Sequence, residues 1–181
     1  PINASIMPTS LCPLPDGRLA ITSLKGDVLI AQDDDGDGLH GTLSIFEQGL
    51  AAPFGLLWQN DALLVAHKPE VLRLLDTDDD GHADHREVVA SGWGYSDNYH
   101  DWTTGMIRDR NGNLFLGLGS DYSDRNRSPD RDRWRGGIVK VNSAGHVSPV
   151  AMAFRYPMGL AFESAGRLYA TDNQGVQNTF N

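Results

Sequence analysis

The stretch TGMIRDRNGNLFLG, residues 104–117, decides the fold. It contains a short apolar run, a polar turn around Asn111 and Gly112, and a second apolar run, which is the pattern of a β-hairpin. The same plan recurs as PFGLLWQNDALLVA at 53–66 and as MGLAFESAGRLYAT at 158–171, and its second half recurs as PDGRLAITS at 15–23. The sequence therefore predicts one hairpin repeated along the chain.

The spacing of the hairpins predicts a β-propeller. The equivalent residues Arg18, Ala62, Asn113 and Arg167 follow one another at steps of 44, 51 and 54 residues, which is the period of four-stranded propeller blades with variable loops. Further strand-like runs supply outer strands, at 27–33, 70–76, 86–92, 136–142 and 146–151. No window of 11 or more residues has an apolar period of 3.6 residues, so we expect very little helix.

We therefore expect an all-β chain that forms a single partial propeller domain over 1–181. It would hold about three and a half four-stranded blades, near 1–50, 51–100 and 101–153, with an incomplete blade at 154–181. A six-bladed ring needs about 300 residues at this period, and both ends of the chain read like the interior of a longer protein. We interpret it as a fragment, with an open apolar blade face at each end.

Composition and charge narrow the range of partners. The chain has 181 residues, a net charge of -9 and a pI near 4.9, so a nucleic acid would be repelled, and small molecules, sugars or cations are better candidates. No apolar run reaches about 18 residues, so we expect no membrane insertion in this segment. No signal peptide is visible, which is uninformative for a fragment.

The stretch DTDDDGHADHRE, 76–87, has the spacing of a calcium-binding loop. Calcium takes six to eight oxygens, which a 12-residue loop supplies from positions 1, 3, 5, 7, 9 and 12, with glycine at position 6. Gly81 stands at position 6, and the candidate ligands are Asp76, Asp78, Asp80, the carbonyl of His82, Asp84 and Glu87. The alternative is a polar hairpin turn whose aspartates and glycine suit left-handed backbone.

A second acidic loop, DDDGDGLHGTLS at 33–44, has candidate ligands at Asp33, Asp35 and Asp37, but Gly41 and Ser44 stand where later acids would be needed. Because strands rather than helices are expected on both sides of each loop, calcium would act as a structural staple on a blade hairpin and not as a switch. Calcium at 100 times its dissociation constant would add about 2.7 kcal/mol to the free energy of unfolding.

Three stretches could build a ligand site at one mouth of the propeller channel, where loops of several blades meet. SDNYHDWTTG, 96–105, carries His100 and Asp101; a histidine with a pKa near 6.5 suits a general base, and a loop histidine bonded to backbone is the alternative. FRYPMGLAF, 154–162, presents Arg155, whose planar guanidinium could hold a carboxylate or quinone oxygen or form an interblade salt bridge. TDNQGVQN, 171–178, offers carbonyls around Gly175 to a cation.

The arginine-rich stretch 121–137, DYSDRNRSPDRDRWRGG, alternates arginine with aspartate. This pattern indicates a long, solvated loop over one face of the propeller, with its charges paired among themselves.

These stretches together resemble the soluble quinoprotein glucose and sorbosone dehydrogenases, which are six-bladed propellers that bind pyrroloquinoline quinone (PQQ) and calcium. The resemblance covers about 95–178 and runs through NGNLFLGLGSD, RGGIVKVNSAGHV, RYPMGLAF and GRLYATDNQG. The stretch 76–94 looks like the large bacterial relatives known as membrane-bound dehydrogenase domains, which are often joined to cytochrome c modules. The NGNL hairpin is also shared by lactonase-like and NHL-type propellers.

The resemblance implies roles for particular residues. His100 would be the base that removes a proton from a sugar or alcohol hydroxyl while hydride passes to the quinone, and Asp121 would orient that histidine. The cofactor and its calcium would be held by Arg155, Tyr156, Gln174, and the carbonyls of Gly175 and Val176. The resemblance also implies a periplasmic or secreted protein with a cytochrome c as a candidate electron acceptor.

The chain departs from the family at Tyr156, where asparagine is usual, and at Val176, where proline is usual. His100 also lies two residues further from its following glycine. These departures favour a rival hypothesis, a noncatalytic propeller that is stapled by calcium and binds carbohydrate or a protein partner. A lactonase-like metal hydrolase would need acids and asparagines facing the channel around one ion, and the sequence shows no convincing set.

Overall fold

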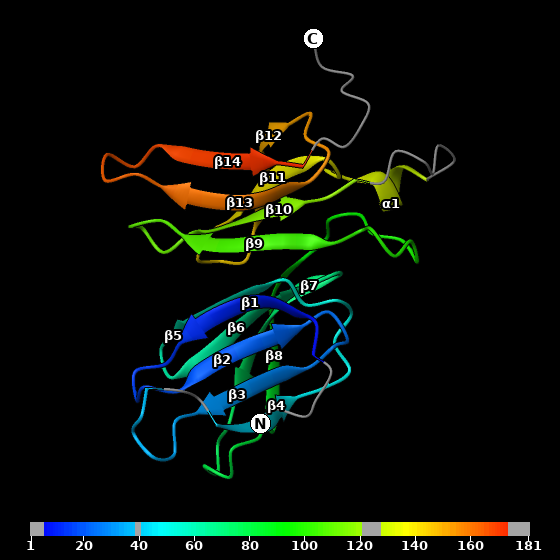
Figure 1. The fold of residues 1–181 in the computed structure, drawn as a ribbon. Coiled ribbons are helices and arrows are strands. Elements are labelled where there is room, and N and C mark those ends of the chain that lie inside the picture. Colours follow the sequence, from blue (N-terminus) through cyan, green and yellow to red (C-terminus); the bar gives the residue numbers. More distant parts are fainter. Residues whose placement is uncertain (1–5, 39–40, 121–127, 174–181) are drawn as a thin grey trace.

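A computed structural model of the chain describes residues 6–38, 41–120 and 128–173 (Figure 1). These residues form three four-stranded antiparallel sheets and one two-stranded sheet. The prediction of an all-β, partial β-propeller is therefore confirmed. The described part contains one helix, the four-residue α1 (Pro129–Asp132), and no helix there is long and apolar enough to span a membrane.

Each four-stranded sheet follows the chain order of its strands, as hairpins joined side by side. The first sheet contains β1 (Pro8–Pro13), β2 (Leu19–Ser23), β3 (Val28–Gln32) and β4 (Thr42–Glu47). The second contains β5 (Gly55–Gln59), β6 (Ala62–His67), β7 (Glu70–Leu75) and β8 (His85–Ser91). The third contains β9 (Thr103–Arg108), β10 (Leu114–Leu118), β11 (Gly137–Val141) and β12 (Val147–Met152), and the last pairs β13 (Pro157–Phe162) with β14 (Leu168–Asp172).

The core lies between successive sheets, and β6 illustrates how the sequence builds it. Every residue of β6 is buried, because neighbouring sheets cover both of its faces. Leu63 and Val65 belong to the apolar cluster shared with the first sheet, whereas Leu64 and Ala66 belong to the cluster shared with the third sheet. Successive side chains of a strand point to opposite faces, so a continuous apolar run serves two cores at once.

The far face of the first sheet carries a row of apolar side chains. The cross-strand register aligns Leu11 with Ile21, Ile21 with Leu29, and Leu29 with Ile45. Ile21 and Leu29 are buried, but Leu11 and Ile45, on the two edge strands, are exposed. Only the outer two of these four side chains are exposed, so the open apolar face expected at each end of the chain stays a prediction.

The two ends of the sheets carry different connections. The first strands of successive sheets contact one another, and β1, β9 and β13 run in the same direction in Figure 1. We call the end at which β1, β5, β9 and β13 begin the mouth end, and the opposite one the far end. Because the strands alternate in direction, the β8–β9 and β12–β13 connections lie at the mouth end, and both acidic loops lie at the far end.

Candidate functional site

An aromatic row follows the mouth end across three sheets. Phe54, Trp102 and Tyr156 each stand immediately before the first strand of a sheet, so they occupy equivalent positions in the repeat. The rings of Phe54 and Trp102 are stacked with centroids 4.8 Å apart, and the rings of Trp102 and Tyr156 lie 5.7 Å apart. The repeat thus places a row of contacting aromatic rings where loops of successive blades meet.

His100 lies at the edge of this row, in the irregular connection between β8 and β9. Its exposed ring is 5.1 Å from the ring of Tyr99 and 5.6 Å from that of Trp102, measured between centroids. Its backbone N–H donates to Oδ1 of Asn98 at 2.8 Å. Its carbonyl accepts from the N–H of Trp102 at 2.9 Å and from the hydroxyl of Tyr156. The imidazole of His100 is therefore accessible to solvent, while hydrogen bonds hold its backbone on both the N–H and the carbonyl side.

Asp101, next to His100, has a structural position. Its side chain is fully buried, and its Oδ2 accepts a hydrogen bond from the hydroxyl of Ser96 at 2.5 Å. The contact closes the six-residue segment 96–101 on itself, so this carboxylate supports the backbone that carries His100.

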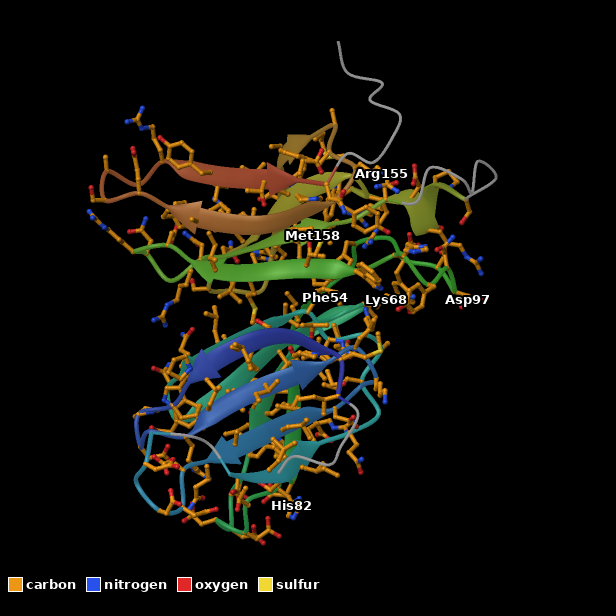
Figure 2. All side chains as sticks on the ribbon, in the orientation of Figure 1. Phe54, Lys68, His82, Asp97, Arg155 and Met158 are labelled. Carbon is orange, nitrogen blue, oxygen red and sulfur yellow. The ribbon has the colours of Figure 1, made fainter. Side chains whose placement is uncertain are left out.

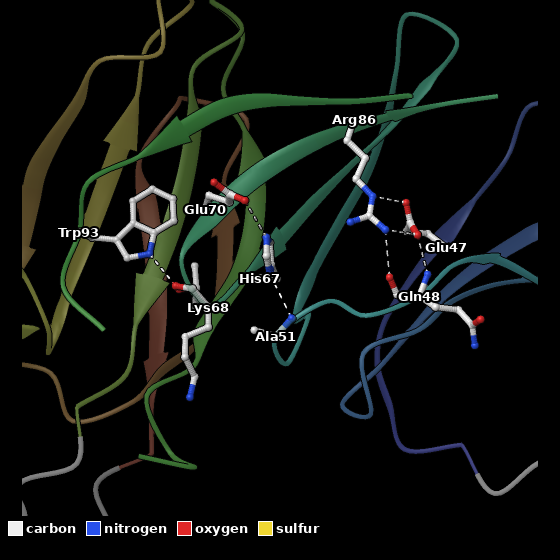
Figure 3. Close-up of polar contacts among 9 residues, drawn as sticks. Glu47, Gln48, Ala51, His67, Lys68, Glu70, Arg86 and Trp93 are labelled. Atoms are coloured by element: carbon white, nitrogen blue, oxygen red, sulfur yellow. Dashed lines mark hydrogen bonds and ion pairs between the residues drawn. The ribbon is translucent and has the colours of Figure 1, made fainter. Parts of the chain in front are cut away.

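Lys68, which follows β6, reaches the same loop from the second sheet. Its Nζ donates to the carbonyls of Asn98 at 2.8 Å and Ser96 at 3.2 Å. Its own carbonyl accepts from Nε1 of Trp93 at 2.9 Å (Figure 3) and from the hydroxyl of Thr103 at 3.0 Å. Lys68 therefore ties the second sheet to the start of the third.

Arg135 completes the support from the turn that precedes β11 of the third sheet. It is buried, and its guanidinium donates to the carbonyls of Trp102 at 2.7 Å and Gly94 at 3.3 Å. The interpretation of 121–137 as a loop whose charges are solvated and paired among themselves is wrong for this residue, because its guanidinium is buried on backbone carbonyls. Sequence reasoning did not assign Lys68 or Arg135 to the site, because a single basic residue carries no signal for a distant carbonyl.

Arg155 and Tyr156 form the turn into β13. The carboxylate of Asp172 accepts the N–H of Tyr156 at 2.6 Å and that of Arg155 at 3.2 Å. The half-buried Arg155 guanidinium lies 5.3 Å from the Tyr156 ring centroid, and its Nη1 donates to the carbonyl of Asn173 at 3.2 Å. Tyr156 is 4% exposed and packs on Gly119, where an added Cβ would lie 2.3 Å from its Cε1.

The structure thus brings His100, Arg155 and Tyr156 to one end of the molecule from two sheets. Figure 2 shows Lys68 and Arg155 at this end, while His82 of the first acidic loop lies at the opposite side of the molecule. The other residues assigned by resemblance, Asp121, Gln174, Gly175 and Val176, lie outside the described residues.

At the far end, the first acidic loop gathers three of its predicted ligands. Asp76, Asp78 and Asp84 each place one carboxylate oxygen within 4.8 Å of the others. The carboxylate of Asp84 accepts from the N–H of Thr77 at 2.9 Å and also from its hydroxyl. The N–H and then the hydroxyl of Thr77 lower the pKa of Asp84 below its ordinary value. Carboxylate oxygens at this spacing fit a hard divalent cation.

The remaining predicted ligands of this loop lie apart from that group. Oδ1 of Asp80 accepts the N–H of His82 at 2.8 Å, which closes the turn locally. Glu87 is part of β8 and forms a salt bridge to Nη1 of Arg73 at 3.0 Å. Asp80, His82 and Glu87 as calcium ligands stay predictions.

The second acidic loop gathers Asp33, Asp35 and Asp37, whose carboxylate oxygens also lie within 4.8 Å of one another. Asp33 accepts the N–H groups of Gly36 at 2.8 Å and Gly38 at 3.0 Å. Desolvation raises the pKa of Asp33, but the N–H groups of Gly38 and Gly36 lower it further and hold it below its ordinary value. Both loops thus present oxygens to a cation from a β-hairpin.

Comparison with known proteins places this chain among propellers. Residues 13–181 match the family described as "Domain of unknown function (DUF7133)". The PQQ domain of pyranose dehydrogenase from Coprinopsis cinerea is similar with a TM-score of 0.72 at 14% identity, over 96% of this chain and 45% of that one. PQQ-bound aldose sugar dehydrogenase from Streptomyces coelicolor is similar with a TM-score of 0.69 at 18% identity, over 93% and 57%.

Propellers with other chemistry are similar as well. A gluconolactonase from Xanthomonas campestris has a TM-score of 0.63 at 18% identity, over 94% of this chain and 56% of that one. No curated protein matches the sequence. The chain spans roughly half the length of the solved structures that it matches, and at these identities the likeness establishes the fold alone.

Proposed function

The chain belongs to the family described as "Domain of unknown function (DUF7133)", and we propose that it is part of a PQQ-dependent dehydrogenase propeller that oxidises a sugar or another alcohol. The observation that carries the proposal is the convergence at the mouth end of an exposed imidazole, a guanidinium and an aromatic row from successive blades. The similarity in fold to two PQQ-binding sugar dehydrogenases supports it.

The residue types at the mouth end fit a quinone cofactor. Phe54 and Trp102, whose rings are stacked with an interplanar angle of 25°, offer an apolar face to a planar ring system. The Arg155 guanidinium stands beside that row through its contact with the Tyr156 ring, and its planar fork of donors suits a quinone oxygen or a carboxylate. Gln174 and the carbonyls of Gly175 and Val176 would complete the pocket and hold the cofactor's calcium.

The chain's own contribution to the reaction would be orientation and proton transfer. His100 would accept the hydroxyl proton of the substrate on a ring nitrogen, because its imidazole is exposed beside the aromatic row. Asp121 would orient His100, and Arg155 would hold the cofactor. The bound quinone would supply the redox chemistry by accepting hydride from the substrate carbon that bears this hydroxyl.

The acidic loops would bind calcium as staples. The proposal rests on the two groups of three aspartates, each on a hairpin at the far end. Because they lie at the end opposite His100, calcium there would stabilise the blades and take no part in the chemistry. We also propose a periplasmic or secreted location and a cytochrome c as the acceptor of the quinone's electrons.

The test is a spectroscopic titration of the full-length protein with PQQ in the presence of calcium. The expected result is saturable binding at micromolar cofactor that Arg155→Gln weakens about tenfold, because one charge-assisted hydrogen bond is worth about 1.5 kcal/mol or more. Arg167→Gln, an exposed far-end substitution, is the matched control and should leave the affinity unchanged. Absence of binding at micromolar cofactor would remove the enzyme proposal.

Tyr156 favours a second candidate, a noncatalytic propeller that binds carbohydrate. The quinoprotein dehydrogenases that the sequence resembles usually have asparagine at this position, and here the tyrosine hydroxyl donates to the carbonyl of His100. Exposed Tyr99 and the aromatic row would then stack on a sugar ring. Sugar binding without any quinone binding in the same titration would support this candidate.

A further inference from the structure

We propose that Tyr156 and Lys68 are positioning residues that hold the His100 loop in place from the two neighbouring blades. The importance of this for catalysis rests on the proposed function, in which His100 is the base. The resemblance implied that Tyr156 contacts the cofactor, whereas its hydroxyl donates to the carbonyl of His100.

The loop 92–102 contains no strand, so no strand ladder holds its carbonyls. Those partners follow a regular pattern along the chain. The carbonyls of Ser96 and Asn98 accept from Lys68, the carbonyl of His100 accepts from Tyr156, and the carbonyl of Trp102 accepts from Arg135. Every second carbonyl from 96 to 102 is therefore held by a side chain from the second, third or fourth sheet.

The Tyr156 hydroxyl is fixed by its surroundings. The ring is buried, packs on Gly119 where a larger residue would collide with it, and contacts the edge of Trp102. Its N–H donates to the carboxylate of Asp172. A hydroxyl on such a ring cannot follow a moving loop, so the bond sets where the His100 backbone lies.

Lys68 is likewise fixed by its surroundings, on the side of the loop that faces the second sheet. Its carbonyl accepts two side-chain donors, Trp93 and Thr103, which fix the base of the residue. Its ammonium then bridges two carbonyls that are two residues apart. Bonds from a charged donor are stronger than those between neutral groups.

The turn at Arg155 and Tyr156 therefore positions both the proposed cofactor contact, Arg155, and the proposed base, His100. Tyr156 follows Arg155 directly, and the Asp172 carboxylate holds the N–H groups of both. The residue that would hold the cofactor and the residue that would take the proton are therefore placed relative to each other by a single buried tyrosine.

The test uses Tyr156→Phe in the full-length protein, which keeps the buried ring and removes the hydroxyl. Tyr169→Phe, on the exposed part of the same hairpin, is the matched control, and Lys68→Met tests the other side. We expect hydrogen exchange at the amides of His100, Asp101 and Trp102 to accelerate about fivefold in Tyr156→Phe and Lys68→Met, the factor given by losing a hydrogen bond of about 1 kcal/mol. The NMR chemical shifts of the His100 ring should change as well.

In the quinone-loaded protein, Tyr156→Phe should lower kcat about fivefold and change KM by less than twofold. Amide exchange and His100 ring chemical shifts that match those of Tyr169→Phe would overturn the positioning role. Both can be measured without cofactor. If the wild-type protein binds no quinone, the proposed function fails while the positioning role is still decided by these two measurements.

Discussion

Arg86→Met should destabilise the contact between the first two blades, because it removes a bidentate salt bridge to a buried acid. Nε of Arg86 donates to Oε2 of Glu47 at 2.7 Å and Nη2 donates to Oε1 at 2.6 Å, while Nη2 also reaches the carbonyl of Gln48 at 3.1 Å (Figure 3). The side chain of Glu47 is 7% exposed and that of Arg86 is 49% exposed. Methionine keeps most of the aliphatic stem and removes the charge.

The expected cost follows from what the substitution leaves behind. Hydrogen bonds to charged groups contribute about 1.5–3 kcal/mol, and solvent around the exposed half of Arg86 reduces that value. The carboxylate of Glu47 would keep the N–H of Gln48 at 2.7 Å. We therefore expect the free energy of unfolding to fall by about 2 kcal/mol, which for a chain of this length lowers Tm by about 4–8 °C.

A double-mutant cycle measured by urea unfolding tests this reasoning. Glu47→Gln, Arg86→Met and the double variant should give a coupling of at least about 1 kcal/mol. Arg167→Met is the control, because Arg167 pairs with Glu163 while it is 75% exposed, and it should cost less than about 0.5 kcal/mol. An Arg86 variant no less stable than this control, or a coupling near zero, would refute the argument from burial.

Three other predictions address other parts of the molecule. Burial lowers the pKa of His67 below 6.5, although Glu70 opposes this. Below pH 6.5 the unfolded chain therefore binds more protons than the folded chain, so stability should decrease as the pH is lowered. His67→Asn should flatten the dependence of Tm on pH between about 7.5 and 5. Gly119→Ala should cost about 1–3 kcal/mol because its Cβ would meet the ring of Tyr156, and an unchanged Tm would contradict that packing. Calcium should raise Tm relative to chelator, Asp78→Asn should reduce the rise without altering quinone affinity, and equal melting curves with calcium and chelator would exclude the staple.

The fold was predictable because the decisive signals are local. The turn around Asn111 and Gly112 is set by the carboxylate of Asp109, which accepts the N–H groups of Asn111 and Asn113. Apolar runs on both sides of such a turn form β9 and β10. The same logic applies to each repeated hairpin, so spacing alone carried the prediction from one hairpin to a set of blades.

The boundaries of the acidic loops were harder to predict, since acid spacing does not reveal where a strand begins. The 12-residue pattern continues through 85–87, but β8 already begins at His85. Extended backbone carries Glu87 away from the turn and opposite Arg73 on β7. Likewise Ser44, the last position of the second loop, lies within β4. This strand was not predicted, because the run before it is rich in glycine and aspartate.

The site was predictable only in part, because its supports are contacts between blades. His100 and Arg155 could be selected by residue type and position before a strand. Lys68 and Arg135 act on carbonyls about 30 residues away in the chain, and a backbone carbonyl gives no sequence signal. Tyr156 could be named, but the partner of its hydroxyl depends on how the third and fourth sheets pack.

The two ends of the blades divide the proposed chemistry in space. The β7 strand, Glu70–Leu75, begins beside Lys68 at the mouth end and leads into the acidic loop at the far end. Six extended residues span about 20 Å, which is far longer than any metal–ligand bond, so a cation among Asp76, Asp78 and Asp84 cannot also touch a ligand beside His100. Any cation that takes part in the proposed reaction would have to be held by mouth-end groups, and the acidic loops would influence that reaction only through the stability of the blades that carry them.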